Sequence, residues 1–452
     1  MHFATDKQTL DDLNIFGQRG GDSVYGLFSH TQTRGGALLM EQLFREPLSR
    51  PDAIRRRIDI FRWFAESGLP FPFKPEWFDA VEQYLANTDE RSKLSQADGL
   101  LERRIKGLIS TNTEESIIQK GIASLVEIAH ACRDFVSVTA GESTDGEADG
   151  SAYAEERRAL QTLLDEPAFT GVLQHSRRKK LGFEEMAGLD EQLRFRHRSV
   201  VRRVLERIYY LDLYLTVARV AVARKFAFPI VLDRGSNTVR LQGLYHPGLA
   251  GAIPNSITIT SDNNIVFLTG ANMAGKSTFM KSLGITIYLA HMGFPVAASA
   301  MEFSVLDGLF TTINLSDNLG MGASHFYAEV LRVKKVAEEL NRGRNLLVIF
   351  DELFRGTNVK DAYEATIEIT GAFALKRNSI FVISTHIIEA GEVLREQHGN
   401  IGFVFLPTRM ERTRPVYTYQ LESGITDDRH GMVIIRNEGI LDILENGNID
   451  AS

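Results

Sequence analysis

Residues 265–282 read IVFLTGANMAGKSTFMKS, and the rest of the chain can be interpreted outward from this stretch. Its first five residues form an apolar run that predicts a buried strand, and an apolar-periodic helix follows the loop. In between, Gly270, Gly275, Lys276 and Ser277 have the G-x-x-x-x-G-K-[ST] spacing of a phosphate-binding loop. Such glycines let backbone N–H groups surround phosphate oxygens, while the lysine supplies charge to the outer phosphates and the serine offers a hydroxyl to Mg²⁺. Because a strand and a helix flank the loop, a chance glycine-rich turn is the weaker interpretation.

Two later apolar runs end in the polar residues that a P-loop ATPase needs. The run 345–350 leads into Asp351, which we expect to hold Mg²⁺ directly or through water, and Glu352, which we expect to orient or deprotonate the attacking water. Adjacent strand residues point to opposite faces, so the two carboxylates should take different roles. The run 379–384 leads, through one threonine, to His386, which could sense the γ-phosphate. A lone histidine at a strand tip is more often solvated or capping, but beside the other motifs we favour the sensing role.

Composition places the chain among ordinary soluble globular proteins. Its 452 residues suggest about two to four domains, with 44% hydrophobic and 24% charged residues. The formal net charge of −7 argues against a surface wrapped everywhere by nucleic acid but leaves room for a local basic face. The single cysteine, Cys132, excludes an intramolecular disulfide and fits a reducing compartment. The sequence shows no signal-type or membrane-spanning apolar run, so we expect a cytoplasmic protein without membrane contact.

Apolar periodicity differs between the two halves of the chain. Helical spacing dominates the first half, with long helices expected at about 92–136 and 190–225 and an acidic, Gly/Ser-rich flexible loop at 141–151 between them. The second half has short apolar runs separated by Gly, Asn and Asp, a pattern typical of α/β structure. We therefore expect a multidomain protein, with an all-α domain of long helices over 1–228 followed by an α/β P-loop domain over 229–452.

Two basic clusters lie in the predicted helical half. Such clusters could contact DNA phosphates, or they could form solvated helix faces paired with nearby glutamates, and the sequence favours neither. Consecutive arginines spread around a helix, so only some could face one partner. The first cluster is Arg55–Arg57, and the second comprises Arg177, Arg178, Lys179, Lys180, Arg194, Arg196, Arg198, Arg202, Arg203 and Arg207.

Four segments, taken in order, resemble the ATPase domain of the MutS family of DNA mismatch-repair proteins, an ABC-type P-loop ATPase domain. They are TGANMAGKSTFMKSLG, SDNLGMGASHFYAEV, VIFDELFRGTNVKDA and STH. Asn272 is the asparagine that this family favours inside the loop. In relatives the second segment reaches the nucleotide of the other subunit, which implies a γ-phosphate contact for Ser324, and the cofactors are ATP and Mg²⁺. The resemblance implies nucleotide contacts at Gly270, Asn272, Gly275, Lys276, Ser277, Thr278 and Ser324, metal contacts at Ser277 and Asp351, and catalytic roles for Glu352 and His386.

The resemblance covers nearly the whole chain, from about residue 9 to residue 445. The first predicted domain then corresponds to the MutS core and lever domain, and the second to its ABC-type ATPase domain. Only eight residues precede Thr9, which implies a short form lacking the N-terminal mismatch-binding and connector domains. The clamp between the lever helices is expected to be reduced or absent. Ala252 occupies the place of an adenine-stacking aromatic residue, which leaves nucleotide selectivity open.

The function implied by the resemblance is that of an ATP-dependent DNA-binding protein of MutS type. ATP binding and hydrolysis to ADP and phosphate, at composite sites of a homodimer, would drive lever movement on DNA in mismatch repair or recombination. Duplex, mismatched or branched DNA is then the expected partner, with room for a separate repair protein. The alternative is a mechanochemical ATPase that acts on a ribonucleoprotein or protein partner without mismatch recognition. The salt dependence of duplex binding distinguishes the DNA-binding function from this alternative, because phosphate contacts make the affinity for DNA fall steeply with salt concentration.

Overall fold

Packing divides the chain into two compact units, which we describe separately. The sheet unit comprises Met1–Phe28, Leu43–Ile58 and Val220–Ser452, and the helical unit comprises Ser29–Gln42 and Asp59–Arg219. The computed structural model describes residues 3–17, 22–94, 111–140, 151–177, 181–313, 325–354, 356–411, 414–426 and 439–446. The sheet unit therefore includes two N-terminal segments that the sequence analysis placed with the helical domain. None of the helices within these ranges is long and apolar enough to cross a membrane.

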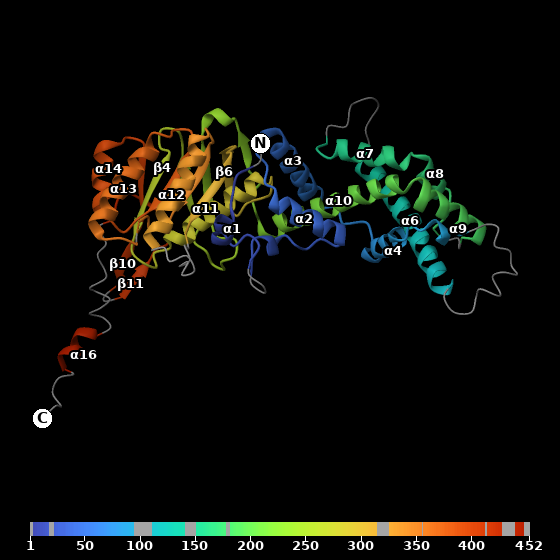
Figure 1. The fold of residues 1–452 in the computed structure, drawn as a ribbon, viewed down its shortest axis with the longest axis horizontal. Coiled ribbons are helices and arrows are strands. Elements are labelled where there is room, and N and C mark those ends of the chain that lie inside the picture. Colours follow the sequence, from blue (N-terminus) through green and yellow to red (C-terminus); the bar gives the residue numbers. More distant parts are fainter. Residues whose placement is uncertain are drawn as a thin grey trace. The chain divides into compact units, whose positions relative to one another are not determined.

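The core of the sheet unit is a six-stranded sheet with strand order β12-β9-β4-β8-β7-β6 (Figure 1). Neighbouring strands pair in parallel, except that the short edge strand β12 is antiparallel to β9. Every residue of β4, β7 and β8 is buried, as expected of parallel strands covered on both faces, and this explains their continuous apolar sequences. The strands are β4 (Ile265–Gly270), β6 (Gly308–Thr312), β7 (Leu346–Phe350), β8 (Ile380–Ser384), β9 (Ile401–Leu406) and β12 (Glu422–Ser423).

Helices cover both faces of this sheet (Figure 1). Phe267, Val348 and Phe381 share a buried core with side chains from α12 (His325–Asn341), α13 (Val359–Ala374) and α14 (Ile388–Gln397). The alternate residue Ile349 faces the other way, towards Gly284 of α11 (Lys276–His291), where an added Cβ would lie 3.5 Å from its side chain. Because the carboxyl ends of parallel strands meet at one edge, the loops after β4, β7 and β8 converge there.

Smaller elements complete the sheet unit. A second sheet has the order β1-β5-β2-β3, and α1 packs against β6. The bounds are α1 (Lys7–Asp12), β1 (Ile230–Leu232), β2 (Val239–Leu244), β3 (Asn255–Ile259), β5 (Ala300–Ser304), the hairpin of β10 (Thr408–Glu411) and β11 (Arg414–Tyr417), and α16 (Ile440–Asn446), with short 3₁₀ turns at Tyr25–Leu27 and Arg234–Ser236.

The helical unit is built around α6 (Thr111–Thr139), which packs on α4, α7, α8 and α9. At Gly121 an added Cβ would lie 2.3 Å from Tyr84, so the glycine permits the close approach of α6 and α4. The remaining bounds are α4 (Pro75–Ala86), a 3₁₀ turn at Glu90–Ser92, α7 (Ala154–Leu164), α8 (Pro167–Leu173) and α9 (Phe183–Asp190); α2 (Arg34–Arg45), α3 (Pro51–Ser67) and α10 (Arg198–Arg224) each contribute residues to both units.

The long helix predicted over 190–225 is interrupted in the structure. A π-helical turn, Glu191–Arg196, follows α9, and α10 begins only at Arg198. The turn coincides with the burial of Arg194, whose guanidinium bonds Asp190 (2.6 Å) and the carbonyl of Ser92 (2.8 Å). Apolar periodicity gives no signal for this break, which coincides with a buried ion pair. Most of the acidic loop predicted at 141–151 lies outside the described residues.

Candidate nucleotide-binding site

The glycine-rich loop has the backbone that its sequence predicts. Gly270 ends β4 with φ +144°, and Gly275 precedes α11 with φ +102°. A Cβ at Gly270 would lie 3.1 Å from the carbonyl oxygen of Leu406, and one at Gly275 would lie 3.1 Å from the ring of Tyr419. Both glycines are therefore required by backbone conformation and by close approach. The loop leaves the N-terminus of α11 open, where backbone N–H groups can bind an anion.

Lys276 lies folded over the loop. Its side chain is buried, and Nζ donates hydrogen bonds to the carbonyls of Gly270 (2.8 Å) and Ala271 (3.1 Å). Burial lowers the pKa of the ammonium, whereas the nearby Asp351 and Glu352 act in the opposite direction. No carboxylate within the described part of the chain forms an ion pair with Lys276. An anion entering the loop would therefore meet a cation that only carbonyl groups hold in place.

Ser277 and Asp351 form a hydroxyl–carboxylate pair. Ser277 Oγ donates to Asp351 Oδ2 at 2.5 Å. Oδ1 of Asp351 is buried and accepts no hydrogen bond from the described residues. Burial raises the pKa of Asp351, and the hydrogen bond from Ser277 opposes that shift. A serine hydroxyl and a carboxylate with an unused oxygen are ligands that suit Mg²⁺. The described residues contain no cluster of three His, Cys, Asp or Glu side chains, so phosphates and water would have to complete the coordination.

Glu352 and His386 meet beside this pair. Nε2 of His386 lies 2.6 Å from Oε1 of Glu352, and the two side chains are 40% and 24% exposed. The expectation that strand alternation separates the two carboxylates was wrong in its premise, because β7 ends at Phe350 and both acids follow it. Glu352 instead adopts the left-handed conformation, with φ +53°. The positive φ, rather than the strand pleat, directs the two carboxylates to different partners, and such strain is typical of functional sites.

A cleft of about 600 Å³ opens beside the loop. Five of the predicted nucleotide contacts line it, and Glu352 lies on its wall. The segment 245–253 forms another wall, and Ala252 leaves this wall without the aromatic residue expected of the family. The five lining contacts are Asn272, Gly275, Lys276, Ser277 and Thr278. The seventh predicted contact, Ser324, lies outside the described residues.

Tyr419 is a cleft residue that the sequence analysis missed. Its ring lies next to Gly275, it lines the cleft, and it is 45% exposed. Asn255 holds it in place by donating to its carbonyl at 2.9 Å and accepting from the backbone N–H of Leu421 at 2.7 Å. Nothing in the local sequence marks this tyrosine. The β10–β11 hairpin, the pairing of β12 with β9 and the hydrogen bonds of Asn255 together bring this segment back to the loop.

Of the seven members of the second basic cluster that the structure describes, five form ion pairs with carboxylates of the helical unit. Arg194 is buried and cannot reach a phosphate, and the side chain of Arg198 donates to the carbonyl of Leu85. The residues Arg178–Lys180 lie outside the described part of the chain. In the first cluster, Arg55 and Arg57 donate to the carbonyls of Val231 and Met292. The ion pairs are Arg177–Asp134, Arg194–Asp190, Arg196–Glu191, Arg203–Glu166 and Arg207–Glu156.

Comparison with known proteins finds matches to the part of the chain that contains the candidate nucleotide-binding site. The family model for MutS domain V matches residues 266–447. The DNA mismatch repair protein MutS of Fusobacterium nucleatum is 29% identical over 54% of this chain and 27% of its own length. The MutS of Desulfitobacterium hafniense is 28% identical over 62% of this chain and 34% of its own length. The MutS of Petrotoga mobilis is 22% identical over 97% of this chain and 63% of its own length.

These matches cover the site and reach beyond it. The domain V match includes the glycine-rich loop, Asp351, Glu352 and His386. The Petrotoga relative also aligns with the helical part, although the chain spans less than two thirds of that relative's length. A helical region followed by a mixed α/β sheet domain agrees with both matches. The chain is therefore similar to MutS proteins, over residues 266–447 to their domain V and over 97% of its length to the Petrotoga MutS.

Proposed function

We propose that the protein is a MutS-type ATPase that hydrolyses ATP to ADP and phosphate. The observation that carries this proposal is the convergence of three groups at one edge of the sheet. These are the glycine-rich loop with its buried lysine, the Ser277–Asp351 pair and the Glu352–His386 pair. Each group corresponds to one requirement of phosphoryl transfer: a phosphate cradle, a metal ligand set and a group that handles the attacking water.

The loop and the hydroxyl–carboxylate pair would bind the phosphates and the metal. Lys276 would exchange the two loop carbonyls for phosphate oxygens. Ser277 and Asp351 would hold Mg²⁺, and the buried, unbonded Oδ1 of Asp351 fits such a ligand. When bound, the ion supplies positive charge to the transferring phosphate. A P-loop ATPase distributes these roles in the same way, with phosphate binding by the loop lysine and metal binding by the serine and the aspartate after a strand.

Glu352 would position the attacking water and accept its proton. Oε1 is held by His386 Nε2, so the histidine fixes the carboxylate at the strand edge where the γ-phosphate would lie. After transfer, the same histidine stands close enough to respond to loss of the γ-phosphate. At the other end of the cleft, Tyr419 offers an exposed aromatic face for the base, in place of the aromatic residue that is missing at Ala252.

A second copy of the chain would complete the site. In this proposal Ser324 of one subunit contacts the γ-phosphate held by the other. The helix α16 exposes Ile440, Leu441, Ile443 and Leu444, by 43%, 39%, 68% and 67%. Four large apolar side chains exposed on seven residues favour burial against a partner, and a homodimer would provide that surface.

The partner that we propose is DNA, engaged through the long helices of the helical unit. The relatives are named DNA mismatch repair proteins, which supports a role in mismatch repair. We propose recombination as a related role and a separate repair protein as a further candidate partner. A ribonucleoprotein or protein partner is the second candidate. It is favoured by the carboxylate pairing of the second basic cluster, which lowers the charge available to phosphates.

The deciding experiment measures ATP hydrolysis with homoduplex, mismatched and branched DNA and with structured RNA, each at two salt concentrations. Salt-sensitive stimulation by one DNA form would support the DNA proposal and identify the substrate. Hydrolysis that no nucleic acid stimulates would favour the protein or ribonucleoprotein candidate. Absence of Mg²⁺-dependent hydrolysis under all conditions would refute the ATPase proposal itself.

A further inference from the structure

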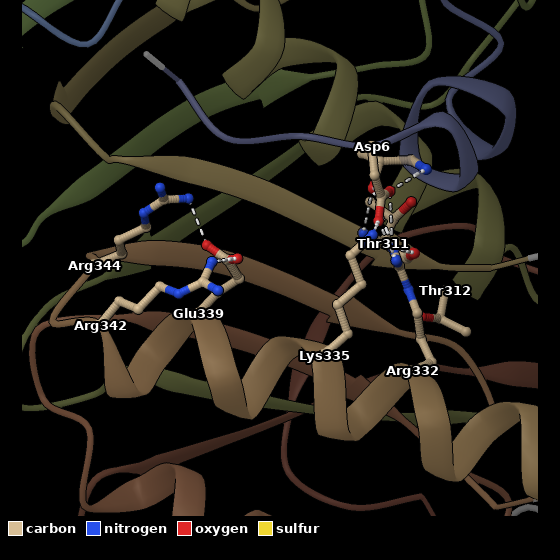
Figure 2. Close-up of polar contacts among 9 residues, drawn as sticks. Asp6, Thr311, Thr312, Arg332, Lys335, Glu339, Arg342 and Arg344 are labelled. Atoms are coloured by element: carbon tan, nitrogen blue, oxygen red, sulfur yellow. Dashed lines mark hydrogen bonds and ion pairs between the residues drawn. The ribbon is translucent and has the colours of Figure 1, made fainter. Parts of the chain in front are cut away.

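The carboxylate of Asp6, in the N-terminal segment of the sheet unit, joins α1 to α12 beside the end of β6 (Figure 2). Asp6 caps α1 by accepting hydrogen bonds from the backbone N–H and the hydroxyl of Thr9, at 3.0 and 2.8 Å. It also forms ion pairs with Arg332 and, at 2.6 Å, with Lys335, both on α12. The side chains of Asp6 and Arg332 are only 14% and 8% exposed. Loss of Asp6 would leave the buried guanidinium of Arg332 without a carboxylate partner among the described residues.

Arg332 spreads its guanidinium over the end of β6. Nη2 donates to the carbonyl of Thr311 at 2.7 Å, and Nε donates to the hydroxyl of Thr312 at 3.2 Å. From α1, Asp12 accepts hydrogen bonds from the Thr311 hydroxyl at 2.7 Å and from the backbone N–H of Ile313 at 2.9 Å. The carboxyl end of β6 is therefore bonded to α1 and α12 at the same time.

Thr312 connects this network to the candidate metal carboxylate. Its carbonyl accepts a hydrogen bond of 2.9 Å from the backbone N–H of Asp351. Thr312 also pairs with Phe350 in the β6–β7 ladder. A displacement of the β6 end would thus move the backbone from which Asp351 reaches Ser277. Thr312 therefore links Arg332 to Asp351 by two hydrogen bonds, one from Arg332 to its hydroxyl and one from the backbone N–H of Asp351 to its carbonyl.

We propose that Asp6 and Arg332 are positioning residues for Asp351 and that their ion pair sets the magnesium dependence of the nucleotide site. The inference rests on the proposed ATPase function, in which Asp351 is the metal carboxylate. Neither residue lines the cleft, so both act through Thr312. The N-terminal segment, far from the glycine-rich loop in sequence, thereby becomes part of the support of the site.

The ion pairs of Asp6 with Arg332 and Lys335 persist at neutral pH, because all three side chains are charged. Burial by itself raises the pKa of Asp6, but Arg332 and Lys335 outweigh burial and hold the pKa well below its usual range. Asp6 is therefore ionised at neutral pH. The pair is a constant support for β6 rather than a pH-dependent switch.

Two substitutions test the proposal. Asp6→Asn keeps the size of the side chain and an acceptor for Thr9 but removes the charge. Arg332→Lys keeps the buried charge compensated but lacks the planar fork that reaches Thr311 and Thr312 together. In both variants we expect the Mg²⁺ concentration for half-maximal hydrolysis to rise about tenfold and kcat to fall about tenfold, since small displacements of reacting groups are costly. The Kd for Mg²⁺-free ADP should not change, because the loop is untouched.

Glu339→Gln is the matched control. Glu339 lies on the same helix and forms ion pairs with Arg342 and Arg344, none of which is on β6 (Figure 2). This variant should keep the wild-type magnesium dependence. Thermal unfolding confirms that each variant is folded at the assay temperature. Wild-type magnesium dependence in folded Asp6→Asn and Arg332→Lys would overturn the proposal, as would an equal loss of Mg²⁺-free ADP affinity.

A separate readout distinguishes this inference from the proposed function. If the wild-type protein hydrolyses no ATP, the ATPase proposal fails. The variants are then compared calorimetrically by the gain in ADP affinity that Mg²⁺ produces. A smaller gain in both variants than in Glu339→Gln supports positioning, and an equal gain in all three refutes it.

Discussion

Two aspartates, Asp351 in the sheet unit and Asp212 in the helical unit, show how similar chemistry serves different purposes. Burial raises the pKa of both carboxyl groups. Asp212 is completely buried, and its oxygens accept hydrogen bonds from the backbone N–H groups of Gln32 and Thr33 and from the Thr33 hydroxyl, at 2.7–3.0 Å. Asp351 accepts a hydrogen bond from Ser277, and the Ser384 hydroxyl also acts to lower its pKa, but Oδ1 has no hydrogen-bond partner of normal geometry among the described residues. A fully bonded carboxylate is structural, whereas an incompletely bonded one at a strand end is a candidate ligand.

The surroundings of Asp212 explain the turn that contains Thr33, Gly35 and Gly36. The Thr33 hydroxyl accepts from the backbone N–H of Gly36 at 3.0 Å while it donates to Asp212. A Cβ at Gly36 would lie 2.6 Å from Oδ2 of Asp212, and one at Gly35 would lie 2.2 Å from the ring of Tyr209. The two glycines are needed because the carboxylate and the ring approach the backbone closely. The aspartate is therefore the centre of a structural turn.

The largest expected effect comes from Glu352→Gln. The substitution keeps the size of the side chain but removes the carboxylate that would accept the proton of the attacking water. We expect kcat to fall by about 10²–10⁴-fold, while the Kd for ATP changes little. Steady-state hydrolysis and binding of a fluorescent ATP analogue measure the two quantities. Glu389→Gln, an exposed acid on nearby α14, is the control, and unchanged turnover in Glu352→Gln would remove this residue from catalysis.

Alanine at each of the two aspartates tests the comparison directly. Asp351→Ala should strongly reduce Mg²⁺-dependent turnover, although by less than Glu352→Gln. Its cost to the free energy of unfolding should be small, because removing a carboxylate with a raised pKa also removes an ionisation that disfavours the folded state at neutral pH.

Asp212→Ala should instead lower the free energy of unfolding and leave turnover intact. It leaves buried N–H and hydroxyl donors without partners, at about 1–3 kcal/mol each, while turnover per folded molecule persists. Urea unfolding and hydrolysis rates, measured on both variants, give the answer. Equal stability losses at the two positions would contradict the distinction between structural carboxylate and ligand.

Tyr419→Ala extends the test to the base end of the cleft. Loss of the ring should weaken ATP binding by about 1–3 kcal/mol, a typical value for base–aromatic stacking, and Tyr419→Phe should retain most of the affinity. Tyr417, whose ring centroid lies 6.1 Å from that of Tyr419, does not line the cleft, so Tyr417→Ala is the matched control. Equal ATP affinity in all three variants would place the base elsewhere.

The part of the site that the sequence predicts is the part encoded locally. The strand, loop and helix of residues 265–282 appear as β4 and α11, and the runs before Asp351 and His386 appear as β7 and β8. Each depends on residues within a few positions of one another, where apolar runs and glycine spacing are direct signals. The convergence of the three loops then follows from parallel pairing.

The remaining features depend on contacts between distant segments. Tyr419 reaches the loop through the pairings of β10 with β11 and of β12 with β9, and Asp6 reaches Arg332 across more than 300 positions of sequence. The left-handed Glu352 is a backbone conformation that no periodicity indicates. Similarly, the sequence shows that arginines cluster on α10, but it does not show which glutamates form ion pairs with them. Local patterns identify which chemistry is present, whereas tertiary packing decides which groups remain available.

The smallest expected effect concerns the arginines of α10 and tests whether the partner is DNA. On α10, Arg203 and Arg207 pair with Glu166 (3.5 Å) and Glu156 (2.6 Å), whereas Arg202 is exposed and has no ion-pair partner among the described residues. If DNA contacts this helix, Arg202→Gln should reduce the slope of log K against log salt by about 0.9, the value for one phosphate contact. Arg207→Gln should change the slope less, because its charge is already compensated. Duplex titrations at several salt concentrations measure both slopes. An equal decrease would show that carboxylate pairing does not exclude phosphate contact, and no decrease in either would favour a partner other than DNA.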